Sequence, residues 1–598
     1  MNPVQRFPSN RQVLLPLLAL ALLWCVGLFG RNYWTPDEPR EAALAASVMQ
    51  QPLPLPTLNG VRFAEKPPMT YWLAGAAMRT FGEQPGAARA PQLAYALLAF
   101  IAMLSLLRSL LGPGPEAAAA CWCGAAVFAS SALVYQVQIW LDTDALLLAG
   151  ACVALAGMYR ALNAEGDDAS ARSQRWRGYF LMHAGLTLAF FAKNFAAWLV
   201  PVLAFVCFIA WERRWRELLR PQFWVCALLP LGCIALWVGA IAAQPDGARM
   251  LRILFWNNLT GRALPIAMEA QYDYSSGHHN SPGRYFLELP LYLLPWTLLA
   301  AYSLEAAWRG ARRPGMRRAA WRFALCAAFP GLIVLSVAST ARSIYAAPCM
   351  IGFALMMALA IERLAADATA ARRVQAGTAV LLLLLALFVL GANAALQWSE
   401  MRTSWMLYLV SSCTAALIAA WCAKIIFTPK TTSGPRRPVT ERLQQVAIAW
   451  CLLLSVGLLC LGSAVNRAQD LRSFAYRVAW NAGTDPLLLW NPDETTLAWA
   501  QLYLPAGRWR SLTSTGASAD VTATPANAMV ISLMPGQWMR EQWLEYLRGR
   551  SPTRTADANE PLLSAAGFSE IGQIERPGGR GYFLWRRAAA AQAPGVVQ

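Results

Sequence analysis

Charged residues gather directly after the first apolar run of the chain, in the segment Tyr33 to Glu41 (YWTPDEPRE). Its acids Asp37 and Glu38 are of the type that orients or deprotonates a nucleophile, and Arg40 is of the type that binds phosphate oxygens. Thr35 can cap a helix that starts at the next residue, in which case the two acids merely favour the helix N-terminus. The pattern predicts either a catalytic acid pair with a phosphate-binding cation or an ordinary helix start.

A second charged segment, Phe63 to Trp72 (FAEKPPMTYW), follows a proline-rich stretch. Aromatic side chains next to charges are typical of helices that lie in the membrane interface. Lys66 is a candidate phosphate-binding cation, and the alternative is a snorkelling interfacial lysine. Tyr71 is a candidate for the wall of a substrate cavity.

Two acids, Asp142 and Asp144, stand where another apolar run begins (IWLDTDALL). Carboxylates at the mouth of a membrane helix are costly unless they face water, a metal or a cation, so both are functional candidates, with an N-cap as the alternative for either one. Lys193 lies at a tight turn between two apolar runs, where it can pair with an acid or contact a substrate. Which aspartate faces the site stays open.

Two further segments carry candidate residues. Arg342 and Tyr345 (STARSIY) place a cation and a phenol at the start of an apolar run, and His278 and His279 lie in a polar loop (YDYSSGHHNSPG). Adjacent histidines cannot easily aim at one ion, so a metal site would use one of them together with Glu65, and solvent or substrate contacts are the alternative. If these segments meet, acids, cations and a phenol surround one cavity, as handling an anionic lipid phosphate requires.

Membrane helices are the elements that must position these residues. Apolar residues make up 57% of the 598 residues and charged residues 14%, a balance that is rare in a water-soluble protein. The apolar runs predict about thirteen spans, because a helix needs about 20 residues to cross the hydrocarbon core. These lie at 12–30, 86–108, 115–135, 143–162, 178–193, 195–211, 222–243, 284–306, 320–338, 344–362, 375–397, 404–427 and 444–465. All thirteen cysteines lie in or beside these runs, as core residues rather than a disulfide framework.

The loops between the spans alternate in charge. One set is rich in arginine, for example 172–177, 211–220 and 309–322, and the other set, which includes the long loops 31–85 and 244–283, has few excess cations. Because positive loops stay in the cytoplasm, the N-terminus is predicted to be cytoplasmic and the candidate residues to lie on the outer face. The net charge of +18 therefore needs no nucleic-acid partner.

The tail after the last predicted span has the composition of a soluble domain. Leu487–Trp490, Met529–Met534 and Tyr582–Trp585 read as strands, whereas Thr496–Tyr503 and Gln537–Arg548 read as helices. The chain is thus predicted to be a polytopic α-helical membrane domain over 1–465, with interfacial helices in its first outer loop, followed by a soluble α/β domain over 466–598 on the outer side.

Several of these motifs together resemble a known family. They are similar to lipid-carrier-dependent glycosyltransferases of the C-type fold, in particular to the aminoarabinose transferases that modify lipid A. The resemblance covers the whole chain, including the number of spans and the outer tail. It rests on Asp37–Arg40 (DEPR), Phe63–Pro68 (FAEKPP), Leu141-Asp142, 188–201 (LAFFAKNFAAWLVP), Leu294–Thr297 (LPWT) and Tyr345.

The resemblance implies roles for individual residues. Asp37 would be the essential acid, with Glu38 beside it, and Asp142 or Asp144 would be a second important acid. The carrier phosphate would be bound by the cations and phenol named above, Arg40, Lys66, Arg342 and Tyr345. Glu65 with one histidine of the large outer loop would match a structural zinc site. The family commonly has Lys-Leu-Pro before the tyrosine, whereas this chain has Arg342-Ser343-Ile344 and so keeps the cation but lacks the proline.

The expected function is an inverting transfer of a sugar like 4-amino-4-deoxy-L-arabinose from undecaprenyl phosphate to a lipid A phosphate, by a monomer at the periplasmic face of a bacterial inner membrane. One alternative keeps the fold and changes the sugar or acceptor, for example a hexosamine on lipid A, a glycan or a protein hydroxyl. A lipid transporter or flippase would favour charges near mid-membrane and repeat symmetry, neither of which the sequence has. A noncatalytic scaffold leaves the charged outer segments unexplained.

Overall fold

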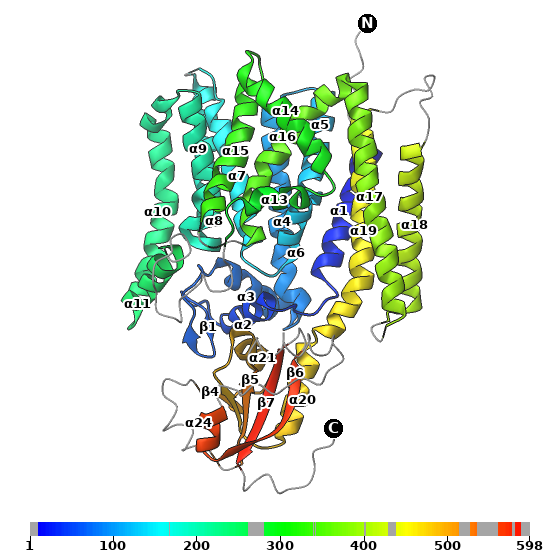
Figure 1. Cartoon of the computed structure of the whole chain (residues 1–598). Helices are drawn as coiled ribbons and strands as arrows, with labels where there is room; N and C mark the ends of the chain where they lie inside the picture. Colours follow the sequence, from blue (N-terminus) through cyan, green and yellow to red (C-terminus); the bar gives the residue numbers. More distant parts are fainter. Residues whose placement is uncertain are drawn as a thin grey trace.

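Most of the chain forms long apolar helices that run side by side, and its C-terminal part forms a small sheet domain beyond one end of them (Figure 1). This computed structural model describes residues 10–166, 168–260, 280–338, 340, 342–399, 402–427, 438–512, 525, 527–534, 560–576 and 580–587. The helices of the bundle are α1 (Asn10–Leu28), α4 (Pro85–Leu111), α5 (Pro115–Ser130), α6 (Ala132–Ile139), α7 (Asp144–Leu162), α8 (Ala169–Lys193), α9 (Leu199–Trp211), α10 (Pro221–Ala242), α13 (Arg284–Tyr292), α14 (Thr297–Arg312), α15 (Arg318–Val337), α16 (Met350–Ala366), α17 (Ala368–Gln397), α18 (Trp405–Phe427) and α19 (Val439–Ala468).

The helices agree with a polytopic membrane protein. Nine helical segments among the described residues are long and apolar enough to cross a membrane, or up to eleven if each of two bent pairs is one span, and Val13–Leu28 is a shorter apolar helix. One of the nine, Ala169–Trp211, reverses direction at Asn194, where φ is +52°. Tyr179 near the start of α8 donates a 2.8 Å hydrogen bond to Glu217 just after α9, so the two arms return to the same end of the bundle. The tight turn predicted after Lys193 is therefore confirmed.

Two predicted spans are not straight helices. α5 meets α6 at 63° and α13 meets α14 at 118°, so the spans predicted over 115–135 and 284–306 are each broken into two bent helices. The two breaks lie against each other, and the N–H of Ala132 donates to the carbonyl of Leu294 at 2.9 Å. Irregular backbone at membrane depth is tolerated where protein groups take up its hydrogen bonds in this way.

Glycines bring α7 and α8 into close contact. Gly150 and Gly157 of α7 face Gly185 and Gly178 of α8, and an added Cβ at Gly157 would lie 2.3 Å from a backbone nitrogen of α8. Small residues at helix contacts let membrane helices approach this closely. The start of α7 is therefore held in register beside the end of α8.

Short elements connect the bundle helices and cross its end. Helices α2 (Asp37–Ser47) and α3 (Met69–Phe81) lie across the bundle between it and the sheet domain, as predicted for interfacial helices of the first loop (Figure 1). The other short elements are β1 (Thr57–Leu58), β2 (Val61–Arg62), η1 (Asn194–Trp198), η2 (Trp215–Leu219), α11 (Gly247–Leu251), η3 (Arg252–Thr260) and η5 (Ser343–Cys349).

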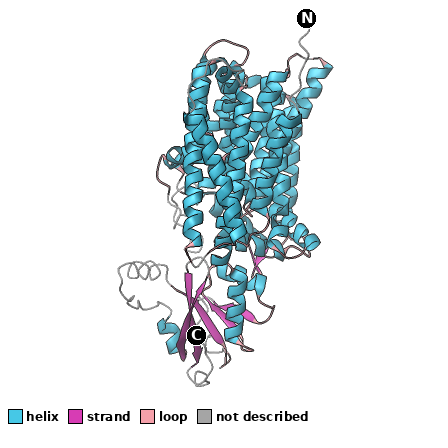
Figure 2. Ribbon diagram, turned by 90° about the vertical axis from the view of Figure 1, so that its right-hand side faces the viewer, coloured by secondary structure: helices cyan, strands magenta, loops and turns pink. Residues whose placement is uncertain are grey.

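The C-terminal domain is a five-stranded mixed sheet in the order β4-β3-β5-β7-β6. Figure 2 shows its strands gathered at one end of the helices. β3 runs parallel to β4 and β5, while β7 is antiparallel to β5 and β6. The three predicted strands and the helix predicted at 496–503 are confirmed, and the helix predicted at 537–548 lies outside the described residues. The elements are α20 (Leu471–Ala482), β3 (Leu487–Trp490), α21 (Glu494–Tyr503), β4 (Trp509–Leu512), β5 (Met529–Leu533), α24 (Glu560–Ala565), β6 (Phe568–Arg576) and β7 (Arg580–Arg587).

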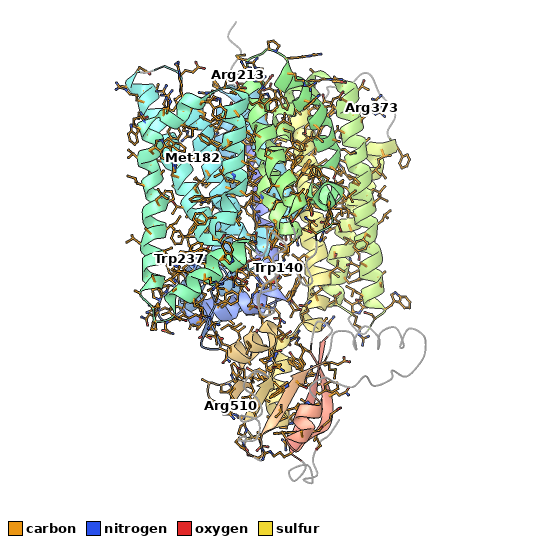
Figure 3. All side chains as sticks on the ribbon, turned by 60° about the vertical axis from the view of Figure 1, so that its left-hand side comes forward. Trp140, Met182, Arg213, Trp237, Arg373 and Arg510 are labelled. Atoms are coloured by element: carbon orange, nitrogen blue, oxygen red, sulfur yellow. The ribbon has the colours of Figure 1, made fainter. Side chains whose placement is uncertain are left out.

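Residues of two predicted basic segments lie at one end of the bundle. Figure 3 shows Arg213, just after α9, and Arg373, in the first turns of α17, at the end far from the sheet domain, and Arg510 within that domain. Trp140 lies near the opposite end, which faces the sheet domain and is here called the domain-side end. The positions of Arg213 and Arg373 agree with the expectation that the basic segments share one end of the bundle.

The contact between α7 and α8 leads to a test of the bundle. Gly157→Ala should destabilise the detergent-solubilised protein by about 1–3 kcal/mol, because the new methyl group overpacks a closed helix contact. Gly239→Ala in α10 is the matched control, since an added Cβ there meets no atom within 4 Å. Thermal unfolding measures both variants, and equal melting temperatures would contradict the close contact.

Candidate functional site

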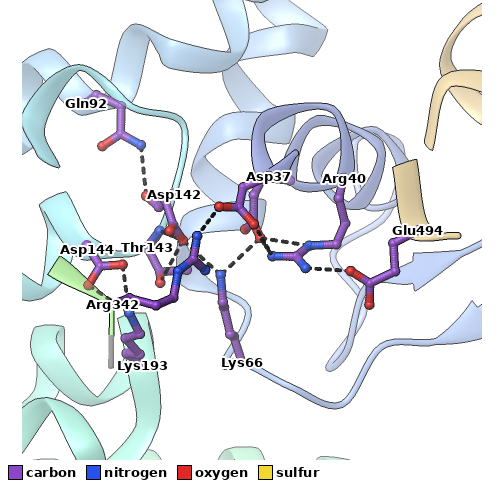
Figure 4. A network of polar contacts seen from close by, with 11 residues as sticks. Asp37, Arg40, Lys66, Gln92, Asp142, Thr143, Asp144, Lys193, Arg342 and Glu494 are labelled. Carbon is purple, nitrogen blue, oxygen red and sulfur yellow. Dashed lines mark hydrogen bonds and ion pairs between the residues drawn. The ribbon is translucent and has the colours of Figure 1, made fainter. Parts of the chain in front are cut away.

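Asp37 begins α2 at the domain-side end of the bundle, where Figure 4 shows it between two guanidinium groups. One carboxylate oxygen lies 3.4 Å from Nη2 of Arg40, and the other pairs with Arg342. The carboxylate is 12% exposed. The predicted cap by Thr35 is wrong, because no side chain caps α2 and the Thr35 hydroxyl donates to Gln469 instead.

Glu38, the next residue of α2, has other partners than Asp37 and is fully buried. Arg31 and Arg89 pair with it at 2.9 and 2.7 Å, and the N–H groups of Trp34 and Leu141 donate to its oxygens. Burial raises the pKa of this carboxyl, but the two arginine charges outweigh burial and hold the pKa below its ordinary value. Both oxygens of Glu38 therefore fasten the first loop to the bundle, and a catalytic role for Glu38 stays a prediction that these contacts do not favour.

Lys66 lies between two carboxylates. Its Nζ is 3.0 Å from Oε1 of Glu41 and 2.8 Å from Oδ1 of Asp142. Burial lowers the pKa of Lys66, but the charges of the two acids outweigh burial and raise the pKa well above its ordinary value. The snorkelling alternative is therefore wrong, because the ammonium group is buried and paired inside the site.

Asp142 and Asp144 both face the site and use different cations. Burial raises the pKa of Asp142, yet the Lys66 and Lys193 charges outweigh burial and hold that pKa well below its ordinary value. Asp144 accepts from Lys193 with both oxygens at 2.7 Å. The ring of Tyr345 lies over the same ammonium group, with 4.5 Å from Nζ to the ring centroid. The aspartates are thus two acids of one site.

The inner wall of the site carries polar atoms without a protein partner. The hydroxyl of Tyr71 and the Oε2 atom of Glu41 are buried and make no hydrogen bond. Buried polar atoms of this kind are costly unless a water or a ligand contacts them. Tyr71 and Glu41 can therefore offer polar atoms to a water or a bound molecule beside Lys66, and the place of Tyr71 in the wall of a substrate cavity stays a prediction.

The predicted metal site falls largely outside the described residues, because His278 and His279 both lie there. Glu65 is described and partly buried. In the described ranges no group of three or more His, Cys, Asp or Glu residues is gathered as a metal ion would require. The metal site stays a prediction.

Sequence reasoning missed four charged residues of this region. Glu41 follows Asp37 by four residues, so the helical period already places both on one face of α2. Arg31 and Arg89 stand in no motif, and their role appears only when the first loop is folded against α4. Glu494, which lies 2.6 Å from Arg40, comes from the C-terminal domain, and no local pattern predicts that contact.

The site as a whole is a chain of alternating charges contributed by segments far apart in sequence (Figure 4). Its ion pairs run from Glu494 through Arg40 to Asp37 and Glu41, and from Glu41 through Lys66 to Asp142. Each of these cations is paired with carboxylates. An anion that binds here therefore has to compete with the carboxylates for the cations. Such an arrangement can bind an anion and stabilise charge that develops on it.

Comparisons with known proteins point to one group of membrane enzymes. A family model described as dolichyl-phosphate-mannose-protein mannosyltransferase matches residues 65–238. The chain is 30% identical to the undecaprenyl phosphate-alpha-4-amino-4-deoxy-L-arabinose arabinosyl transferase of Pseudomonas paraeruginosa strain PA7 over 68% of this chain and 69% of that protein. It is also 30% identical to the protein of the same name from Pseudomonas aeruginosa strain PAO1, over 69% of this chain and 71% of the relative.

The fold is shared with a solved structure along almost its whole length. The crystal structure of ArnT from Cupriavidus metallidurans bound to undecaprenyl phosphate superposes with a TM-score of 0.68 at 16% identity, covering 98% of this chain and 100% of that one. The apo structure of the same protein gives 0.65 at 14% identity. From its identity to the Pseudomonas enzymes over two thirds of their length, the chain belongs to the family of undecaprenyl phosphate-α-4-amino-4-deoxy-L-arabinose arabinosyl transferases, which are multi-pass membrane glycosyltransferases.

Proposed function

We propose that this protein transfers 4-amino-4-deoxy-L-arabinose from undecaprenyl phosphate to a phosphate group of lipid A. The names of the relatives support the sugar and its carrier. The convergence of Asp37, Lys66, Asp142 and Arg342 in one charge network is the observation that carries the proposal, because these residues come from four separate segments. A site with paired cations and acids suits a reaction in which phosphate is both acceptor and leaving group.

The reaction is an inverting substitution at the anomeric carbon of the sugar. An oxygen of the acceptor phosphate forms the new bond to that carbon from one face, while the bond to the carrier phosphate oxygen breaks on the other. A phosphate is already a nucleophile near neutral pH, so it needs alignment and charge screening more than deprotonation. Asp37 accordingly orients the acceptor or stabilises positive charge on the sugar.

The leaving carrier phosphate gains negative charge as its bond to the sugar breaks. Arg40 and Arg342 pair with different oxygens of Asp37, and Lys66 lies beside them between Glu41 and Asp142. These cations stabilise the departing phosphate, and Tyr345 contacts it beside Lys193. Preorganised charges in a site that excludes water are the most effective way to stabilise a charge that develops during reaction.

The proposal places the site at the periplasmic face of the bacterial inner membrane, with the N-terminus in the cytoplasm. The basic loops at the end remote from the sheet domain support this orientation. The protein acts as a monomer in this proposal. Zinc at Glu65 and one of the two histidines is a separate prediction, which elemental analysis of the purified protein tests without reference to activity.

Asp37→Asn tests the acid. It should lower transfer by about a hundredfold or more, because the substituted amide loses the charge that orients acceptor and sugar. The measurement is consumption of the lipid-linked sugar by purified protein in liposomes. Glu116→Gln, an exposed acid in the first turn of α5, is the control with the same loss of charge. Full activity of the Asp37 variant would contradict its catalytic assignment.

Lys66→Met tests the cation. Binding of undecaprenyl phosphate should weaken by about ten- to a hundredfold, the expected cost of losing one charged hydrogen bond. Lys66→Arg should retain part of the affinity, and Lys424→Met in the last turn of α18 should retain all of it. An unchanged affinity in Lys66→Met would place the carrier phosphate elsewhere.

Mass spectrometry of lipid A from cells with and without the gene tests the sugar and the acceptor. A phosphate-linked pentosamine that disappears with the gene is expected. A hexosamine mass would instead assign the same fold to another sugar. Unmodified lipid A in both strains would contradict the acceptor, and accumulation of the carrier-linked sugar on one membrane face would favour a flippase.

A further inference from the structure

The C-terminal domain is fastened directly to the helix that carries Asp37. Helix α21 packs on α2, and Ala498 of α21 is buried in one apolar cluster with Leu44 of α2. Gln501 donates to the carbonyl of Ala43 at 2.9 Å and accepts from the N–H of Asn59 at 2.8 Å. The sheet domain is thus part of the wall that surrounds the site.

A second connection holds the chain just before Asp37. Gln469, between α19 and α20, accepts from the N–H of Thr35 at 2.6 Å. Asn466 in the last turn of α19 accepts from the N–H of Asn32 at 2.9 Å and from the indole N–H of Trp34 at 3.0 Å. The backbone that leads into α2 is therefore set by the junction between bundle and sheet domain.

Glu494 is the charged member of this contact. It is the first residue of α21, and its Oε2 atom lies 2.6 Å from Nη1 of Arg40. The same guanidinium group donates to Glu41 at 2.9 and 3.2 Å through Nη2 and Nε, and its Nη2 lies 3.4 Å from Asp37. Three carboxylates therefore share Arg40, and one of them comes from the other domain.

The distances show what Glu494 does to this arrangement. A guanidinium group beside a carboxylate prefers a short two-point pair. Here Nη1 is turned to Glu494, so Arg40 reaches Asp37 through one nitrogen only, and that contact is the longest of the set. Without Glu494, Nη1 loses its partner while Nε and Nη2 keep Glu41, so the guanidinium group can turn toward Asp37 and compete for the carboxylate oxygen that Arg342 does not hold.

We propose that Glu494 is a positioning residue of the active site, through which the C-terminal domain restrains Arg40 and keeps the Asp37 carboxylate available to substrate. The inference rests on the proposed function of Asp37. It assigns the soluble domain a part in the transfer reaction and not only in the stability of the protein.

Because Glu494 is half-exposed, its effect on activity can be measured separately from its effect on stability. Its side chain is 48% exposed, whereas that of Arg40 is 13% exposed. An ion pair with one half-exposed partner is partly screened by solvent, so its contribution to stability is modest. Loss of the Glu494 charge should therefore leave the melting temperature almost unchanged while the geometry around Arg40 changes.

Glu494→Gln, compared with Glu494→Asp in purified full-length protein, is the test. The glutamine variant should lose on the order of tenfold in kcat, with a smaller change in KM for the lipid-linked sugar, because misplacement of catalytic groups acts on the reacting state. The aspartate variant should recover part of kcat. Glu575→Gln, an exposed acid of β6 in the same domain, should match the unaltered protein.

A second pair of variants tests whether Glu494 acts through Arg40. In the Arg40→Lys background, Glu494→Gln should cost less than it does in the unaltered protein, since coupled residues are not additive. Unchanged kcat in Glu494→Gln, equal losses in both backgrounds, no recovery by aspartate, or a loss that merely follows a lower melting temperature would each overturn the proposal. Asp37→Asn is assayed in parallel to separate the two inferences. Full activity of Asp37→Asn would contradict the proposed role of Asp37. Loss of activity in Asp37→Asn together with unchanged kcat in Glu494→Gln would overturn only the role of Glu494.

Discussion

The buried carboxylate of Glu38 fixes the arrangement on which the site depends. A buried ion costs several kcal/mol unless cations and hydrogen-bond donors surround it. Arg31, Arg89 and two backbone N–H groups meet this requirement, and they come from the loop after α1, from α4 and from the loop before α7. The segments must therefore come together for Glu38 to be buried. The neighbouring Asp37 is turned by about 100° around the helix axis from Glu38, and it pairs with Arg40 and Arg342 instead.

The same reasoning explains why the site holds so many charges near a membrane. Lys66 is stable there because Glu41 and Asp142 surround it, and Lys193 because Asp144 accepts from it with both oxygens. The buried cations are therefore neutralised by the protein's own carboxylates and do not need a substrate for this. An anionic headgroup that binds there must compete with these carboxylates for the cations.

The sequence predicts much of the fold, because long apolar runs and loop charge are strong local signals. It also indicates that five charged residues gather at one place, because charged residues beside apolar runs are costly unless they face water or a partner. These residues are Asp37, Lys66, Asp142, Asp144 and Lys193. It fails where the outcome depends on distant contacts. The breaks at Ser131 and Pro295 satisfy each other across the bundle, and the separate roles of Asp37 and Glu38 follow from which partners surround each one.

The contact between α7 and α8 has a consequence beyond the packing of two helices. Asp144 is the first residue of α7 and Lys193 the last of α8, so the glycine contacts farther along the pair set the spacing between these two charges. One inserted residue in either arm would turn its charged end by about 100° around the helix axis. The length of this hairpin is therefore constrained as tightly as the identity of the two residues at its tip.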